Sequence, residues 1–164
     1  MSQANQTSYQ ESLQKALDDI DQAAKTAKNN IQSAQNVADI ITAAEKGTQA
    51  IAAIETKTEV TFAQADAKEA IANEAAKVKP NLSAADQQTV DGIVTIANGK
   101  IDAATDIPTI NNIKNQAIKD IDQVKTTADS NSKEKVEKAK ELNRTSIDDA
   151  AKKRLLALRR LIRT

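Results

Sequence analysis

The sequence predicts an all-α protein, built as two tandem antiparallel three-helix bundles that form an elongated rod. Three observations predict it. The chain repeats itself at an offset of 70 residues, its apolar residues recur at helical steps of three and four, and it holds one Phe, one Tyr and no Trp. A fixed period is typical of an array of units. Because aromatic side chains bury the most area, their scarcity favours narrow aliphatic seams over one large core.

The repeat relates the two halves of the chain position by position. Most matched positions are apolar residues at helical spacing, so one helical unit is present in two copies. We expect these units at residues 1–79 and 80–164. The identical or similar pairs are Ile31 with Ile101, Ile40 with Ile110, Ile51 with Ile121, Ile20 with Val90 and Ile54 with Val124.

Periodicity predicts six helical segments. Pro80 ends the third, because the residue before a proline avoids helical geometry. Ser83 is a good N-cap for the fourth, and Pro108 suits the first turn of the fifth. A polar turn at 129–132 is expected before the sixth, and a join of the second and third through 56–61 is left open. The segments span about 7–34, 37–55, 60–78, 83–104, 107–128 and 133–162.

The apolar stripes of these segments give the expected core. Gly47, inside the second segment, costs about 1 kcal/mol relative to alanine and has no evident role. The expected core residues are Leu13, Leu17, Ile20, Ile31, Ile40, Ile51, Ile54, Val90, Ile93, Ile101, Ile110, Ile121, Val124, Leu155 and Leu158.

Composition excludes several chemistries. The chain has no Cys and no His, so zinc sites built on these residues, disulfides and His-dependent nucleophile systems are impossible. Its three glycines are scattered and form no phosphate loop. The acidic groups at 18–21 and 148–149 fall on helices, where a solvated face is the favoured interpretation over a cation or acid–base site. Gly92 and Gly99 share a helix face, which fits close packing or simple tolerance better than a docking patch. We expect no enzyme, no cofactor and no metal.

The formal charge is zero, but basic residues gather near residue 160. Arg159, Arg160 and Arg163 lie beside Leu155 and Leu158 in a basic amphipathic helix. Such a helix can contact an anionic membrane or nucleic-acid phosphates, although the third helix of a bundle is the favoured interpretation. No apolar run is long enough for a transmembrane span, and residues 1–7 do not read as a signal peptide.

Residues 98–124 contain Ile-Asp-Ala-Ala-Thr at 101–105 and Ala-Ile-Lys-Asp-Ile at 117–121, after a Pro-then-acidic helix start at 80–86. This pattern resembles a tandem helical repeat of unknown function, found in cell-wall-anchored surface proteins of Gram-positive bacteria. The resemblance covers about residues 15–145, is weaker at 31–37, and stops before the Leu/Arg-rich stretch 154–163. It implies surface stalks, cell adhesion, biofilm accumulation or matrix binding without catalysis, and it supplies no site residues.

The leading hypothesis is therefore a non-catalytic stalk or adhesive module on a bacterial cell surface. It would be a monomeric rod that contacts host extracellular matrix, a serum protein, or like repeats on neighbouring cells, with no nucleic acid bound. One alternative is a three-helix ligand-binding module, similar in build to bacterial albumin- or immunoglobulin-binding domains. A weaker alternative is a cytoplasmic helical protein whose basic end binds a membrane or nucleic acid.

Overall fold

The computed structural model describes the backbone of residues 3–161 and the side chains of residues 6–157. This part of the chain is all-helical and contains no strand, which confirms the predicted fold class. The helices are α1 (Gln3–Ser33), α2 (Val37–Val78), α3 (Ala84–Ala103) and α4 (Ile107–Leu161), with a short 3₁₀ turn, η1 (Lys79–Asn81), between α2 and α3.

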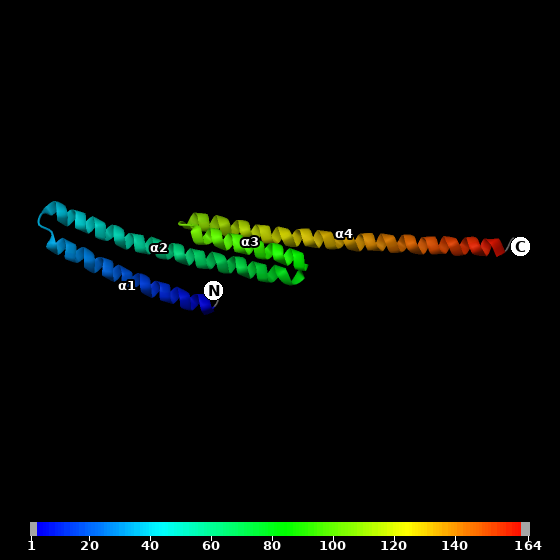
Figure 1. The fold of residues 1–164 in the computed structure, drawn as a ribbon, viewed down its shortest axis with the longest axis horizontal. Coiled ribbons are helices and arrows are strands. Elements are labelled where there is room, and N and C mark those ends of the chain that lie inside the picture. Colours follow the sequence, from blue (N-terminus) through cyan, green and yellow to red (C-terminus); the bar gives the residue numbers. More distant parts are fainter. Residues whose placement is uncertain (1–2, 162–164) are drawn as a thin grey trace.

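The helix α2 takes part in two separate packing units (Figure 1). The helix α1 lies antiparallel to α2 from the start of that helix to Asp66 and, within the described chain, contacts no other helix. The second half of α2 packs against both α3 and α4, which also pack against each other. Beyond this region α4 extends alone, away from the loop that joins α1 to α2.

The core lies where three helices meet: the second half of α2, all of α3 and the first half of α4. Ile71, Val90, Ile101, Ile110 and Ile121 are fully buried there. Alanines at the closest approaches, Ala67, Ala75, Ala97 and Ala117, let the helices pack tightly. Burying each isoleucine contributes about 2 kcal/mol relative to leaving it exposed. We call this unit the bundle.

The expected grouping into bundles at 1–79 and 80–164, and the rod, are not confirmed. Of the six expected segments, the third, fourth and fifth enclose the core. The first and second form a two-helix hairpin, and the sixth has no helix beside it within the described residues. The bundle therefore takes one helix from the expected unit 1–79 and two helices from the expected unit 80–164.

The polar turn expected at 129–132 is wrong, because α4 passes through it without a break. This stretch holds neither Gly nor Pro, and the Ser130 hydroxyl donates to the Thr126 carbonyl oxygen at 2.9 Å. The join at 56–61 is likewise helical. There Thr56, Thr58 and Thr61 each donate to the carbonyl four residues earlier. Polar side chains that bond back onto their own helix do not end it.

Helix ends follow the expected capping. Ser83 accepts a hydrogen bond from the Asp86 backbone N–H at 3.3 Å, and Pro80 lies in η1. Asn36 caps α2 by accepting from the Asp39 N–H at 3.0 Å. Asp106, 70 residues later, does the same for α4 by accepting from the Thr109 N–H at 2.8 Å.

The expected core is correct only inside the bundle. Val90, Ile101, Ile110 and Ile121 are buried there. A second group is only partly buried: Ile20, Ile31, Ile51, Ile54, Ile93 and Val124. Four positions are exposed, which corrects the prediction: Leu13 (44%), Leu17 (49%), Ile40 (41%) and Leu155 (56%). They are exposed because the α1·α2 hairpin has no third helix over it and the end of α4 has no neighbour. The side chain of Leu158 lies outside the described residues.

Candidate interaction surfaces

The sequence repeat is also a structural repeat. The α1·α2 hairpin turns at 34–36 and the α3·α4 hairpin at 104–106. Each has a shallow groove between its helices, and the lining positions match at an offset of 70. In the first hairpin they include Ala23, Thr26, Ala27, Asn30, Ala43, Lys46, Gly47 and Ala50; in the second, Ile93, Ile96, Ala97, Lys100, Ile113, Gln116, Ala117 and Asp120. The two hairpins therefore pack in the same register.

Gly47 has a packing role that the sequence did not reveal. A Cβ added at this position would overlap the Cβ of Ala27 on α1. The equivalent residues of the second hairpin are Ala97 and Ala117, so the first hairpin is closer by one methyl group. Gly92 and Gly99 differ, since a Cβ at either would meet nothing within 4 Å. They make no close approach.

Replacing Gly47 by alanine should destabilise the α1·α2 hairpin by about 1 kcal/mol. Overpacking costs about 1–3 kcal/mol, and the better helix propensity of alanine offsets about 1 kcal/mol of that. Thermal unfolding followed by circular dichroism measures the change. The double variant Ala27→Gly/Gly47→Ala moves the methyl group to the other helix and should restore most of the loss. A single variant more stable than the parent would contradict the close contact.

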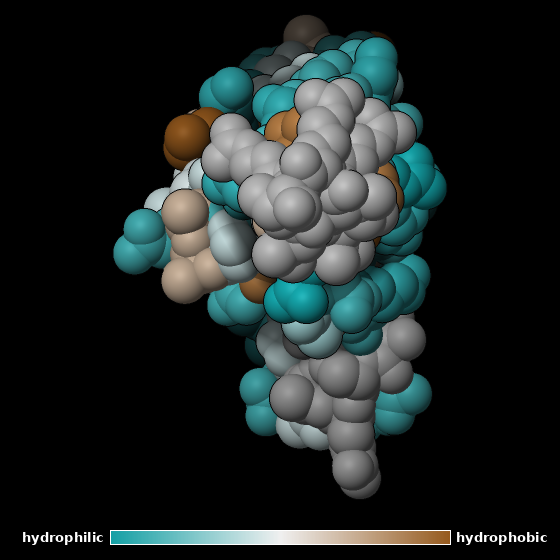
Figure 2. Space-filling view, turned by 90° about the vertical axis from the view of Figure 1, so that its right-hand side faces the viewer, coloured by the Kyte–Doolittle hydropathy of each residue, from teal (hydrophilic) through white to brown (hydrophobic). Residues whose placement is uncertain are grey.

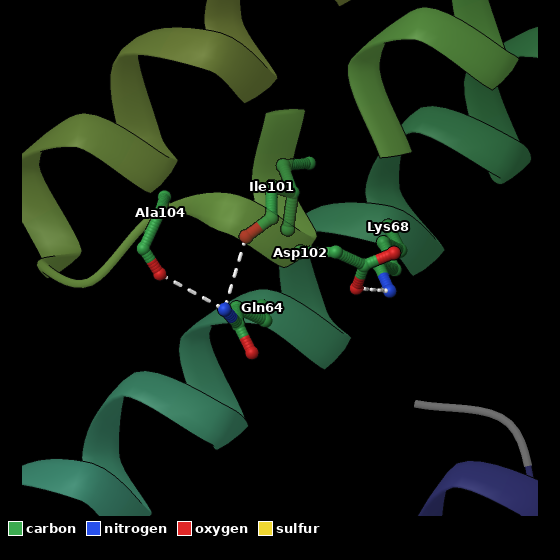
Figure 3. A network of polar contacts seen from close by, with 5 residues as sticks. All are labelled: Gln64, Lys68, Ile101, Asp102 and Ala104. Carbon is green, nitrogen blue, oxygen red and sulfur yellow. Dashed lines mark hydrogen bonds and ion pairs between the residues drawn. The ribbon is translucent and has the colours of Figure 1, made fainter. Parts of the chain in front are cut away.

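Gln64 on α2 ties the end of α3 to the bundle (Figure 3). Its Nε2 donates to the carbonyl oxygens of Ile101 and Ala104, each at 3.0 Å. These carbonyls belong to the last turn and the C-cap of α3, where helical partners run out; the Ile101 carbonyl also accepts from the Ala104 backbone N–H at 3.1 Å. One turn along α2, Lys68 forms an exposed ion pair with Asp102. The second half of α2 thus covers the α3·α4 hairpin with both apolar and polar contacts.

Replacing Gln64 by alanine should lower the free energy of unfolding by about 1–2 kcal/mol, because two partly buried hydrogen bonds are lost. Lys68→Ala is the matched control one turn away. It should cost less than about 1 kcal/mol, since exposed ion pairs contribute little. Urea denaturation of both variants measures the difference. Equal losses would show that the side-chain amide does not hold α3 in place.

The two aromatic side chains of the protein stack between α1 and α2. Tyr9 and Phe62 lie with ring centroids 3.6 Å apart and planes inclined by 19°. They fix the N-terminal part of α1 against the middle of α2. This contact could not be predicted from the sequence, because the two residues are far apart in the chain.

The last part of α4, residues 129–161, is here called the α4 tail. Every described side chain in it, through residue 157, is exposed. Local ion pairs support it: Lys138 with Glu134 and Lys140 with Glu137, both at 2.6 Å. An isolated helix is only marginally stable in water. Large apolar side chains also face solvent along the α4 tail: Val136 (50%), Leu142 (72%), Ile147 (69%), Leu155 (56%) and Leu156 (59%).

The other candidates from the sequence lie apart from these surfaces. Arg159 and Arg160 fall on the α4 tail, but their side chains, like all of Arg163, lie outside the described residues. Asp18 accepts from Gln14 Nε2 at 3.0 Å, and Asp19 pairs with Lys15 at 2.7 Å, both on an exposed face. Residues 148–149 are exposed on α4. No group of three or more metal-ligating side chains converges in the described part of the chain.

The pKa of the Asp106 carboxyl group is shifted clearly from its ordinary value. The Thr109 backbone N–H, and then its hydroxyl, hydrogen-bond the Asp106 carboxylate and hold its pKa below the usual 3.8. A lowered folded-state pKa stabilises the fold above the usual value, and this stabilisation is lost as the pH falls through the folded-state pKa. The charge of Asp106 therefore makes the folding stability depend on pH in the acidic range, through the cap at the start of α4.

Replacing Asp106 by asparagine keeps a side-chain cap but removes the charge. Wild type should melt above the variant near neutral pH, and the difference should shrink as the pH falls below 3.8 and through the lower folded-state pKa of Asp106. Melting curves across this range measure it. A difference that stays constant with pH would show that the Asp106 charge is not involved.

Comparison with known proteins found no match to this chain among protein-family models, curated proteins or solved structures. No helix within residues 3–161 is long and apolar enough to span a membrane.

Proposed function

We propose that this chain is a non-catalytic structural repeat segment of a bacterial surface protein, which acts as a stalk or spacer. In this role it holds a more distal part away from the cell wall, and its exposed faces contact host matrix or like repeats on neighbouring cells. The resemblance of residues 98–124 to surface-protein repeats supports the location.

The observation that carries the proposal is that α2 belongs to both packing units. It pairs with α1 up to Asp66 and helps to complete the bundle from Val60 onward. A bend between the units would have to break a helix of 42 residues in its middle. Continuous helices of this kind transmit length and force along the chain, which is what a spacer requires.

The surface chemistry agrees with a mechanical role. No described polar or charged residue is buried as a whole, although the Asn98 Oδ1 atom is enclosed without a partner, and the grooves of the two hairpins are shallow. Viewed from the end of α4, the surface is mostly hydrophilic with a few separate hydrophobic side chains (Figure 2). Reactive groups that worked together would need a shared, water-excluding site.

Small-angle X-ray scattering on the purified chain, at a protein concentration too low for association, tests the shape. At 1.5 Å per residue, α4 alone is about 80 Å long, and with the first half of α2 the length reaches about 110 Å. The radius of gyration should then be about 30 Å, against about 15 Å for a compact domain of this size. Antibody labelling of intact cells of the producing organism tests the location. A compact particle, or labelling only after lysis, would overturn the proposal.

One observation favours a second function, a ligand-binding three-helix module. The groove between α3 and α4 has a mostly apolar floor with polar side chains at its rim, and Ile96 at its edge is 62% exposed, whereas the equivalent residue of the first hairpin is Thr26. Calorimetric titration with serum albumin and with immunoglobulin G tests it. Binding that Ile96→Glu abolishes and Thr26→Glu leaves intact would support this function, and no heat with either protein would exclude it.

A further inference from the structure

The two hairpins differ in what covers them. In the α3·α4 hairpin, Val90, Ile101, Ile110 and Ile121 are fully buried because the second half of α2 lies over them. In the α1·α2 hairpin their equivalents are less buried: Ile20, Ile31 and Ile51 only partly, and Ile40 is 41% exposed. The same apolar face is therefore present in both hairpins, but only the second has a third helix.

The α4 tail has the residues of such a third helix. At an offset of 76 residues, it reproduces four of the six positions with which α2 faces the bundle core, whereas Ala67 and Val78 correspond to Asn143 and Arg154. The matched pairs are Val60 with Val136, Ala63 with Ala139, Ile71 with Ile147 and Ala75 with Ala151. In α2 these four positions are buried in the core or packed against it, whereas in the α4 tail all four are exposed. The tail therefore has a helix face without a hairpin, and α1·α2 is a hairpin without a covering helix.

The chain cannot join these two surfaces within one copy. The α4 tail extends away from the α1–α2 loop, at the opposite end of the molecule (Figure 1). It runs in the same direction as α2 and opposite to α1. In the bundle, the second half of α2 likewise runs with α4 and against α3. A second copy shifted along the long axis would therefore receive the tail in the orientation that the bundle already uses.

Charge favours the same pairing. Residues 133–163 contain eleven basic and five acidic side chains, whereas residues 1–55 contain four basic and seven acidic ones. Opposite net charges speed encounter and suppress the pairing of like ends. Two tails would repel each other, and so would two hairpins.

We propose that the α4 tail of one copy packs onto the α1·α2 hairpin of a second copy and completes a second three-helix bundle. The occupant of the open hairpin face is therefore another molecule of this chain. Each copy has one tail and one hairpin, so the contact is heterologous and generates an open head-to-tail array. This inference goes beyond the proposed function, since it holds wherever the protein is located.

Sedimentation velocity on the full-length chain tests the proposal. The weight-average mass of the wild type should rise with concentration beyond that of a dimer. Ile147→Glu places a charge in the tail face, and Ile40→Glu places one in the hairpin face at a position exposed enough to accept it. Each variant alone should remain monomeric. Thr145→Glu, on the opposite side of the tail, is the matched control and should assemble like the wild type.

Mixing the two variants decides the mode of contact. The Ile147→Glu chain keeps its hairpin and the Ile40→Glu chain keeps its tail, so an equimolar mixture should form a discrete 1:1 dimer and nothing larger. A mixture that stays monomeric would overturn the proposal. Dimers of Ile40→Glu alone would also overturn it, because they would show that tails pair with tails.

A further titration does not depend on how well Ile40→Glu folds. The Ile147→Glu chain retains an unaltered hairpin, so it should cap wild-type arrays. A tenfold excess should reduce them to short oligomers, and Ala151→Glu should act in the same way. Arrays that keep their size under this excess, or a wild type that remains monomeric at every concentration, would contradict the head-to-tail contact.

Discussion

Replacing Ile101 by alanine should lower the free energy of unfolding by about 3 kcal/mol, as large an effect as any single truncation in the bundle should have. Ile101 is fully buried among the three helices of the bundle. The lost methyl and methylene groups would leave a cavity. The helices would close it poorly, because the alanines between them already pack tightly. Equilibrium urea denaturation at a low protein concentration measures the loss.

Ile31→Ala is the matched control, since it removes the same atoms at the equivalent position of the α1·α2 hairpin. Ile31 is only partly buried, so the loss should be about 1 kcal/mol. The ratio between the two variants measures what a covering third helix contributes. Equal losses would mean that the first hairpin has a complete core of its own, and that the boundaries described here are wrong.

Replacing Thr58 by proline should destabilise the protein by about 3 kcal/mol or more. Residue 58 lies in the middle of α2, where that helix passes from the hairpin to the bundle. A proline removes the backbone bond to the Ile54 carbonyl, and its ring clashes with the same group. The kink would also displace the hairpin relative to the bundle. Chemical denaturation measures the stability loss, and scattering should detect the changed shape.

Asn131→Pro is the control for this substitution. It makes the same backbone change in α4, at a residue whose side chain is exposed and packs against no other helix. The helix content should fall, whereas the unfolding midpoint of the bundle should not move. If Asn131→Pro destabilised the bundle as much as Thr58→Pro, the α4 tail would have a partner within the same copy. If Thr58→Pro had no effect, the two packing units would be independent.

Much of the fold follows from local sequence. The helical class, the breaks near 34–36, 79–83 and 104–106, and the cap at Ser83 all depend on spacing, proline and short polar side chains, which act within one turn of the chain. The four isoleucine and valine positions at the centre of the bundle were also correct, because a stripe shows which face of a helix is apolar. These signals require no knowledge of what lies opposite.

Which helices belong together could not be read in the same way. A stripe shows that a face needs a partner, but not which helix supplies it. The sequence placed segments three and six at the ends of their own units, whereas the structure places the third with the following hairpin. The stretch at 129–132 was misjudged for a related reason: four polar residues suit a turn as well as an exposed helix, and only the missing Gly or Pro favoured the helix.

The contacts that hold the units together were invisible in the sequence because they connect distant residues. Gln64 reaches carbonyl groups 37 and 40 residues away, and Tyr9 meets Phe62 across two helices. Gly47 stood out as a cost within its helix, and only the position of Ala27 explains it. A search for small residues at equivalent repeat positions, such as Gly47 and Ala117, would have indicated that close approach.

Hydrogen exchange followed by mass spectrometry tests the central claim most directly. At a protein concentration too low for association, amides of 63–78, 84–103 and 107–124 should exchange most slowly and together. Those of α1 and the first half of α2 should exchange faster, and those of 133–157 fastest, because protection follows packing. Equal protection of 84–124 and 133–157, with rapid exchange at 56–61 and 129–132, would contradict the account and restore two bundles divided at residue 80.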